Sequence, residues 1–242
     1  MEGTVIAIHQ PNYFPWLGFA HKMMNCDIFV LLDTVQFPRR NYVNRTHIRV
    51  KDEPRWLTVP VSGDYHDTIN RIRIANGRPW QRKHLKTIET NYGRARFFPS
   101  FMPRIENILL SHWSLLADLN LEICDFYKTV LGLDTKLVSA SQLDIDESLS
   151  STGLLVAIVK ALSGSFYLAG ASGRKYMEMD LFEKVGIKVL WQEFHYPTYP
   201  QTRPGMVPNL SSIDAFFNCG RTETKRLLEG IKKPRTEDDQ CC

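Results

Sequence analysis

The sequence has no apolar stretch of the length that a membrane span needs. None of its apolar runs approaches the roughly 20 residues that cross a bilayer. Its opening, Met1-Glu2-Gly3, has no basic start, and the first apolar run is only a few residues long, so we expect no secretory signal peptide. These absences predict a soluble, cytoplasmic protein without a membrane span.

Cysteine is scarce as well. The five cysteines are Cys26, Cys124, Cys219, Cys241 and Cys242. Their number is odd and they are scattered along the chain, which argues against a disulfide framework and gives no metal-binding spacing. Cys241-Cys242 ends an acidic, polar segment but is not part of a full C-terminal prenylation signal, so we assign it no role.

The chain also lacks a strong charge of one sign. Its 30 basic and 26 acidic residues give a formal net charge of +4. This surplus is too weak to predict nucleic-acid binding, and we expect no nucleic-acid partner, although a mildly basic protein suits an anionic small ligand. Hydrophobic residues make up 43% of the chain, which is ample for a folded core.

What the sequence does contain is an apolar strand that runs into a polar, proline-rich turn. Residues 5–8 are apolar, and His9-Gln10-Pro11-Asn12-Tyr13 follows directly. Pro11 and Pro15 restrict the backbone on both sides of residues 12–14, which predicts a stiff turn that holds polar groups ready for a ligand. The alternative is that His9 and Asn12 only bind loop backbone, as turn residues often do.

Several further segments predict an α/β fold with a parallel core sheet of the nucleotidyltransferase or Rossmann-like kind. Apolar runs at 27–33, 135–139, 165–169 and 186–191 are typical of buried parallel strands. Asp33 ends the second strand, so we expect it at the same sheet edge as His9. Gly170-Ala171-Ser172-Gly173 follows the fourth strand as a turn of small residues that could approach a phosphate or simply be tight.

Two segments depart from this pattern. Residues 36–74 alternate between apolar and polar, which predicts an inserted antiparallel β meander, and residues 80–131 have helical spacing. Gly132 is expected to cap the last of these helices. We expect a single α/β domain over residues 1–230, followed by a flexible tail over 231–242.

The polar segments are predicted to converge on one site. The candidate catalytic residues are His9, Asp33 and His195, because imidazole titrates near neutrality and a carboxylate can orient it. The candidate substrate-binding residues are amides, hydroxyls, aromatics and one arginine: Gln10, Asn12, Tyr13, Trp16, Gln36, Asn44, Arg45, Ser172, Tyr199 and Gln201. No metal is assigned, because HxH and HExxH spacings are absent, although His9, Asp33 and His195 could converge on one.

Seven segments together carry a family resemblance: IHQPNYFPWLGF, FVLLDTVQF, NRTHI, WLTVPV, YLAGASGRKY, HYPTYPQ and LSSIDAFFNCG. Over essentially residues 4–220 the chain resembles the WbqC-like family of bacterial proteins. Membership implies a setting in surface-polysaccharide or modified-sugar biosynthesis, as in O-antigen formation, and a supposed role in attaching an acyl or aminoacyl group to an amino sugar. A looser likeness is to nucleotidyltransferase-type enzymes, which adenylate a carboxylate. The paired-histidine HxGH signature of those enzymes is absent here, since Gly18 is followed by Phe19.

These observations leave three functions open. The first is a transferase that forms an amide on a nucleotide-linked amino sugar, with no covalent enzyme intermediate, because Ser172 lacks the GxSxG spacing and Cys219 lies near a helix end. The second is a module that binds a sugar nucleotide without catalysis. The third is an ATP-dependent carboxylate-adenylating ligase. The expected partner is a small molecule, and the sequence identifies no cofactor.

Overall fold

A five-stranded parallel sheet forms the centre of the computed structural model, which describes residues 3–64 and 66–236. Its strands, in spatial order, are β7 (Lys136–Ser139), β2 (Ile28–Leu31), β1 (Val5–His9), β8 (Phe166–Gly170) and β9 (Lys188–Gln192). All neighbouring pairs are parallel. The prediction of an α/β fold with a parallel core sheet is therefore confirmed.

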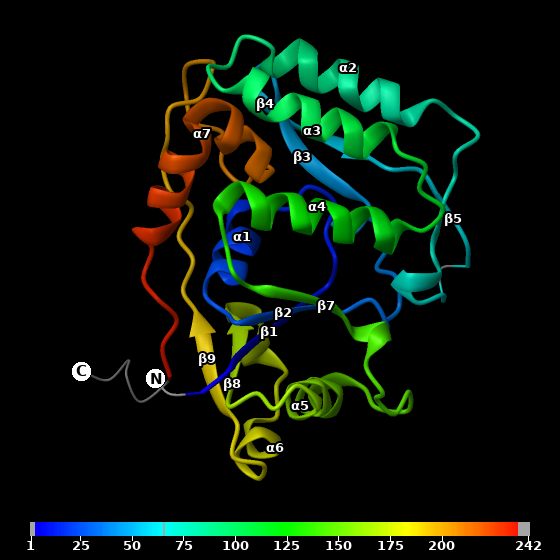
Figure 1. Cartoon of the computed structure of the whole chain (residues 1–242), viewed down its shortest axis with the longest axis vertical. Coiled ribbons are helices and arrows are strands. Elements are labelled where there is room, and N and C mark those ends of the chain that lie inside the picture. The colour runs from blue at the N-terminus through cyan, green and yellow to red at the C-terminus, as the bar shows by residue number, and fades with distance from the viewer. Residues whose placement is uncertain (1–2, 65, 237–242) are drawn as a thin grey trace.

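Helices cover both faces of this sheet (Figure 1). α1 (Leu17–Met24) and α4 (Leu116–Leu131) pack on one face, where Phe19, Met23 and Cys124 meet side chains of the strands. α5 (Ser151–Ala161) and α6 (Met179–Glu183) pack on the other face. Burial on both faces explains why the strands are continuous apolar runs rather than alternating ones.

The order of the strands reverses between β1 and β8. The chain passes from β1 to β2 and then β7 on one side, and returns to place β8 and β9 on the other side of β1. In open parallel sheets of this kind the connections diverge at the reversal and leave a crevice outside the carboxyl ends of the two central strands. β1 ends at His9 and β8 ends at Gly170, so the crevice lies between these two residues.

The inserted segment after β2 is antiparallel, as predicted, but it forms two small sheets. β3 (Arg45–Val50) pairs with β4 (Glu53–Thr58), and β5 (Val61–Ser62) pairs with β6 (Arg73–Ile74). Residues 69–71, expected in a strand, form the 3-10 helix η1 (Ile69–Arg71). The apolar Ile69 and Ile72 are three residues apart and both buried, a spacing that puts their side chains on the same side of a 3-10 turn but on opposite faces of a strand.

A second core lies between the insertion and the helices beyond the sheet (Figure 1). It contains α2 (Trp80–Tyr92), α3 (Phe98–Leu110), α4, α7 (Ser212–Glu229) and β3. The predicted helical segment at 80–131 is thus three helices.

α4 ends at Gly132, whose φ of 61° is the left-handed cap expected there. Two further 3-10 helices, η2 (Ala140–Gln142) and η3 (Ala171–Lys175), follow β7 and β8.

The end of the described chain returns to the sheet. Arg235 exchanges two backbone hydrogen bonds with Trp191 of β9, at 2.8 and 3.4 Å. Cys241-Cys242 and the rest of 237–242 lie outside the described residues. The flexible tail over 231–242 and the single domain over 1–230 stay predictions. In the part of the chain that the structure describes, no helix has both the length and the apolar character needed to cross a membrane.

A substitution at Gly220 tests the packing of α7. It interrupts the helix with φ 75° and ψ 178°, and a Cβ there would lie 2.9 Å from the Phe97 ring. We expect Gly220→Ala to lower the free energy of unfolding by about 1–3 kcal/mol, because a left-handed backbone and a steric clash coincide. Urea unfolding measures this, with Gly77→Ala as the control, since a Cβ at Gly77 meets nothing within 4 Å. If both variants lowered the free energy of unfolding equally, the backbone and the Phe97 contact at Gly220 would not explain the loss.

Candidate functional site

The turn after β1 is held by hydrogen bonds to its backbone carbonyls. Asn120 of α4 donates to Pro11 O at 3.1 Å, Thr46 of β3 donates to Phe14 O at 2.9 Å, and Tyr127 of α4 donates to Pro15 O at 3.1 Å. The hydroxyl of Ser211 also donates to Phe14 O, at 2.7 Å. Phe14 has a φ of 40°, which is unusual for a bulky residue and persists because the surrounding structure fixes it. The turn is therefore rigid, as the two prolines predict.

A cavity of about 280 Å³ lies in the crevice between β1 and β8. We call it the sheet-edge cavity. Its polar lining comes from His9 and Gln10 at the end of β1, from Lys22 of α1, and from Ser172 and Tyr176 after β8. Its apolar lining includes Leu155 of α5 and Met177. The structure thus brings three predicted site residues, His9, Gln10 and Ser172, to one cavity.

The protonation of His9 follows from its contacts. Its Nδ1 lies 2.9 Å from Gln10 O, and a carbonyl oxygen can only accept, so Nδ1 carries the proton in the neutral ring. Nε2 is then left as an acceptor. Burial, followed by the nearby charge of Lys22, lowers the pKa of His9 to about 4. His9 therefore presents a neutral imidazole with a free lone pair at neutral pH.

Lys22 is a buried cation beside His9. Only 3% of its side chain is exposed, and its Nζ donates to Ile8 O at 2.8 Å. Side chains on a helix lean toward the helix N-terminus, which lets Lys22 reach back from α1 to the carboxyl edge of the sheet. Burial lowers the pKa of Lys22 to about 8. The amine is thus mostly protonated at pH 7 but titrates close to it.

Asp33 lies at the same sheet edge but serves the neighbouring strand. Its two oxygens accept from the backbone N–H of Ser141 at 2.9 Å and from the Ser141 hydroxyl at 2.6 Å. Ser141 follows β7, so Asp33 ties β2 to β7. Asp33 and His195 are not among the described residues that line the sheet-edge cavity, and the His195 side chain is exposed.

Four predicted binding residues form hydrogen bonds inside the protein. The hydroxyl of Tyr13 donates to His84 at 2.8 Å, and Asn44 donates to Val59 O at 3.0 Å. The hydroxyl of Tyr199 donates to Asp214 at 2.9 Å. The amide of Gln201 accepts from Arg49 at 2.7 Å and from the backbone of Val207 at 3.0 Å. These groups hold the fold around the site rather than facing the sheet-edge cavity.

The remaining predicted binding residues lie in other surroundings. Arg45 stacks its guanidinium over Trp56, 3.9 Å from the ring centroid, and donates to Arg40 O. Trp16 packs edge-on against Phe194. Asn12 is buried in the turn after β1, and exposed Gln36 bridges to Thr68 through the backbone.

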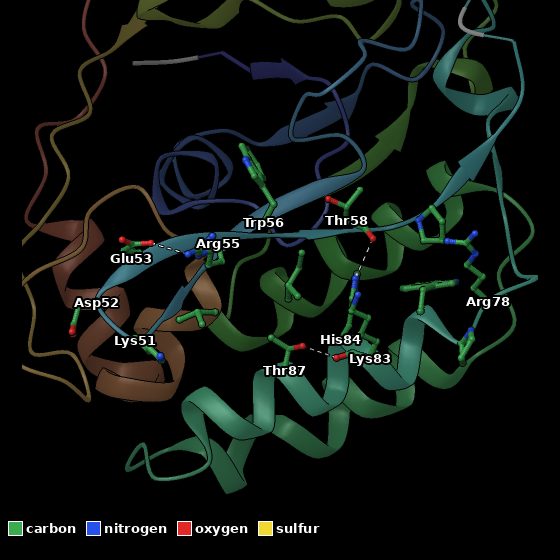
Figure 2. Close-up of a pocket in the computed structure, with 15 residues that line it drawn as sticks. Lys51, Asp52, Glu53, Arg55, Trp56, Thr58, Arg78, Lys83, His84 and Thr87 are labelled. Carbon is green, nitrogen blue, oxygen red and sulfur yellow. Dashed lines mark hydrogen bonds and ion pairs between the residues drawn. The ribbon is translucent and has the colours of Figure 1, made fainter.

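A larger groove, of about 1200 Å³, lies between β4 and α2 (Figure 2). We call it the β4–α2 groove. In Figure 2, His84 points from α2 toward β4, where its Nε2 donates to Thr58 O at 3.2 Å, whereas Trp56 points away from α2. The lining includes Lys51, Arg78 and Lys83. His84 also accepts from Tyr13, so one side chain links the groove wall to the turn after β1.

The described residues offer little to a metal or to covalent catalysis. No group of three or more His, Cys, Asp or Glu side chains suited to a metal occurs among them. Burial raises the pKa of the Cys219 thiol to about 11, and it also raises the pKa of Cys26 and Cys124. All three stay thiols at neutral pH and are poor nucleophiles.

Lys22 was missed by sequence reasoning. It follows His21 within a helix whose other inward positions are apolar, and an isolated lysine there is typical of a solvated face. A charged residue on the sheet-facing side of the first crossover helix is the signal that could have found it.

A comparison with models of known protein families shows the family of this chain. A sequence model of the WbqC-like protein family matches residues 10–226. An uncharacterised protein of Mycobacterium tuberculosis (strain ATCC 25618 / H37Rv), Rv1507c, is 30% identical over 219 residues, which cover 89% of this chain and 94% of the relative. No solved structure matches the chain.

Acid should destabilise the fold below pH 6.5. Burial lowers the pKa of both His21 and His84 from 6.5 to about 4, so in this interval the unfolded chain binds protons that the folded chain does not. The stabilisation is complete above pH 6.5 and is lost as the pH falls toward 4, by up to about 3 kcal/mol for each residue. Urea unfolding from pH 7.5 to 4.5 measures this. A free energy of unfolding that stays constant across this range would show that His21 and His84 are not held in the neutral form by burial.

The contact between Asp33 and Ser141 should contribute to stability. We expect Asp33→Ala to lower the free energy of unfolding by about 1–3 kcal/mol, because it leaves the N–H and hydroxyl of Ser141 without their acceptor. Ser141→Ala should cost less, since it removes one of the two bonds. A double-mutant cycle by urea unfolding gives the coupling, and a coupling near zero would mean that Asp33 does not hold β7.

Proposed function

Because the chain belongs to the WbqC-like protein family, we propose that it is an enzyme that forms an amide on a nucleotide-linked amino sugar. The transferred group is acyl or aminoacyl, and the setting is surface-polysaccharide biosynthesis. One observation carries the proposal: the sheet-edge cavity gathers an imidazole, an amide, an ammonium and a hydroxyl at the point where the strand order reverses. On this proposal the protein is cytoplasmic and its partners are small molecules.

The chemistry assigns a role to each group. The amine of the sugar attacks the acyl carbonyl, a C–N bond forms, and the bond from the carbonyl carbon to the leaving group breaks. Nε2 of His9 takes the proton that the amine loses and delivers it to the leaving group. The Gln10 amide and the Ser172 hydroxyl, which line the same cavity, donate to the oxyanion of the intermediate.

Transfer is direct, without an acylated protein. The buried cysteines are thiols, and Ser172 has no GxSxG turn to activate it. We assign the role of general base to His9, because its Nδ1 is bonded to Gln10 O and its Nε2 is left to accept the proton of the amine. Mass spectrometry of the intact protein after incubation with donor tests this step, and a stable acyl adduct on Ser172 would contradict it.

A turnover assay tests the function. The purified protein is incubated with nucleotide-linked amino sugars and with acyl or aminoacyl thioesters, with and without ATP, and products are followed by mass spectrometry. We expect His9→Ala to lower turnover by about 10²- to 10⁴-fold, the usual contribution of a general base. His195→Ala, which alters an exposed imidazole outside the cavity, should keep turnover within about tenfold.

Other outcomes separate the alternatives. If His195→Ala loses turnover and His9→Ala keeps it, the site is elsewhere. If sugar nucleotides stabilise the protein in a thermal-shift assay but no product forms with any donor, the protein is a binding module. A product that forms only with ATP, together with release of AMP, identifies a carboxylate-adenylating ligase.

A further inference from the structure

The ammonium of Lys22 has fewer partners than its charge and donors require. Its Nζ carries three N–H groups when protonated, and the described residues give one acceptor for them, Ile8 O. The side chain is almost fully buried, so bulk water does not supply the other two acceptors freely. Lys22 lines the sheet-edge cavity, which has a volume of about 280 Å³ and therefore has space for an additional acceptor.

No opposite charge is provided for Lys22 among residues 3–64 and 66–236. No carboxylate in this part of the chain acts on its pKa, which burial lowers. The titratable groups that face the cavity are His9 of β1, Tyr167 of β8 and Tyr176, and Cys26 lies beside Lys22 from the end of α1. Burial keeps His9, Tyr167 and Cys26 uncharged at neutral pH.

A buried cation without a counter-charge destabilises a protein, and titratable groups perturbed by burial cluster at functional sites. The location supports this reading. The carboxyl edge at a strand-order reversal is where open α/β sheets bind ligands. Beside the cavity, a Cβ added at Gly170 would meet no atom within 4 Å, so the turn after β8 leaves open space there.

We propose that Lys22 binds an anionic group of the substrate, a carboxylate or a phosphate, inside the sheet-edge cavity. This inference rests on the proposed function in that it takes the cavity as the substrate site, and it names the chemistry that the site recognises. An anion at Lys22 would complete the hydrogen bonds of Nζ and supply the missing negative charge.

Anion binding would also activate His9. The charge of Lys22 is the second cause, after burial, of the low pKa of His9. A bound anion offsets that charge and raises the pKa of His9 toward neutrality, where a general base is more effective. Substrate binding and basicity are thereby coupled through the contact between these two side chains.

Titration with simple anions tests the proposal. Acetate and inorganic phosphate are added to the purified protein at constant ionic strength, with chloride as the reference anion, and thermal unfolding gives the anion affinity at pH 7. We expect one or both to stabilise the wild type, and the stronger of the two identifies a carboxylate or a phosphate site. Lys22→Met should weaken this binding about 10- to 100-fold. Lys160→Met, at an exposed lysine of α5, should leave it unchanged.

A second measurement uses the unaltered protein. Lys22 must be protonated to bind an anion, so the affinity for acetate should fall roughly tenfold for each pH unit above about 8. In NMR titrations of the wild type, the pKa of His9 should rise when the anion binds. Because Lys22→Met removes a cation from beside His9, it should raise the pKa of His9 without any anion.

Three results would overturn the proposal: no stabilisation by either anion relative to chloride, anion binding that Lys22→Met retains, or an acetate affinity that is the same at pH 7 and pH 9.5. These readouts need no turnover. If anion binding depends on Lys22 but the protein has no transferase activity, the proposed function is rejected and the anion site stands. If Lys22→Met keeps turnover with an unchanged KM, the anion site alone is rejected.

Discussion

The site depends on one topological constraint, the reversal of strand order between β1 and β8. β1 continues into α1 on one face of the sheet, and β8 continues into η3 and α6 toward the other, so the connections that follow these two strands diverge. The crevice that results has walls fixed by the sheet itself. His9, at the end of β1, is positioned by the sheet itself, and Gln10 follows it directly.

The rim is made rigid by groups that never touch the cavity. Carbonyls of the turn after β1 accept from Asn120 and Tyr127 of α4, from Thr46 of β3 and from Ser211 before α7. Each donor is buried, so breaking one of these bonds would leave an unpaired polar group in the interior. Elements far apart in the sequence therefore fix the same short turn, which explains how Phe14 keeps its unusual backbone.

The sequence was sufficient to predict the parallel sheet, because its five strands are apolar runs that only burial on both faces can satisfy. It was also sufficient to place His9, Gln10 and the turn at residues 170–173 at one edge, since those follow strand ends directly. It could not separate ligand-facing polar groups from internal ones. Tyr13, Asn44 and Gln201 have the chemistry of binding residues, yet their partners are protein atoms brought in by tertiary contacts that no local pattern encodes.

Lys22 shows the opposite failure, and the reason lies in energetics. Lysines are common on exposed helix faces, so an isolated lysine in a helical segment is a weak signal, whereas a lysine buried without a carboxylate opposes folding. Its ammonium lowers the pKa of His9, so the ligand-free site holds a weak base next to an unneutralised cation. Binding of an anionic group would both neutralise the Lys22 cation and raise the pKa of His9. A site built in this way is least stable when empty, and part of the affinity for its ligand derives from relief of that instability.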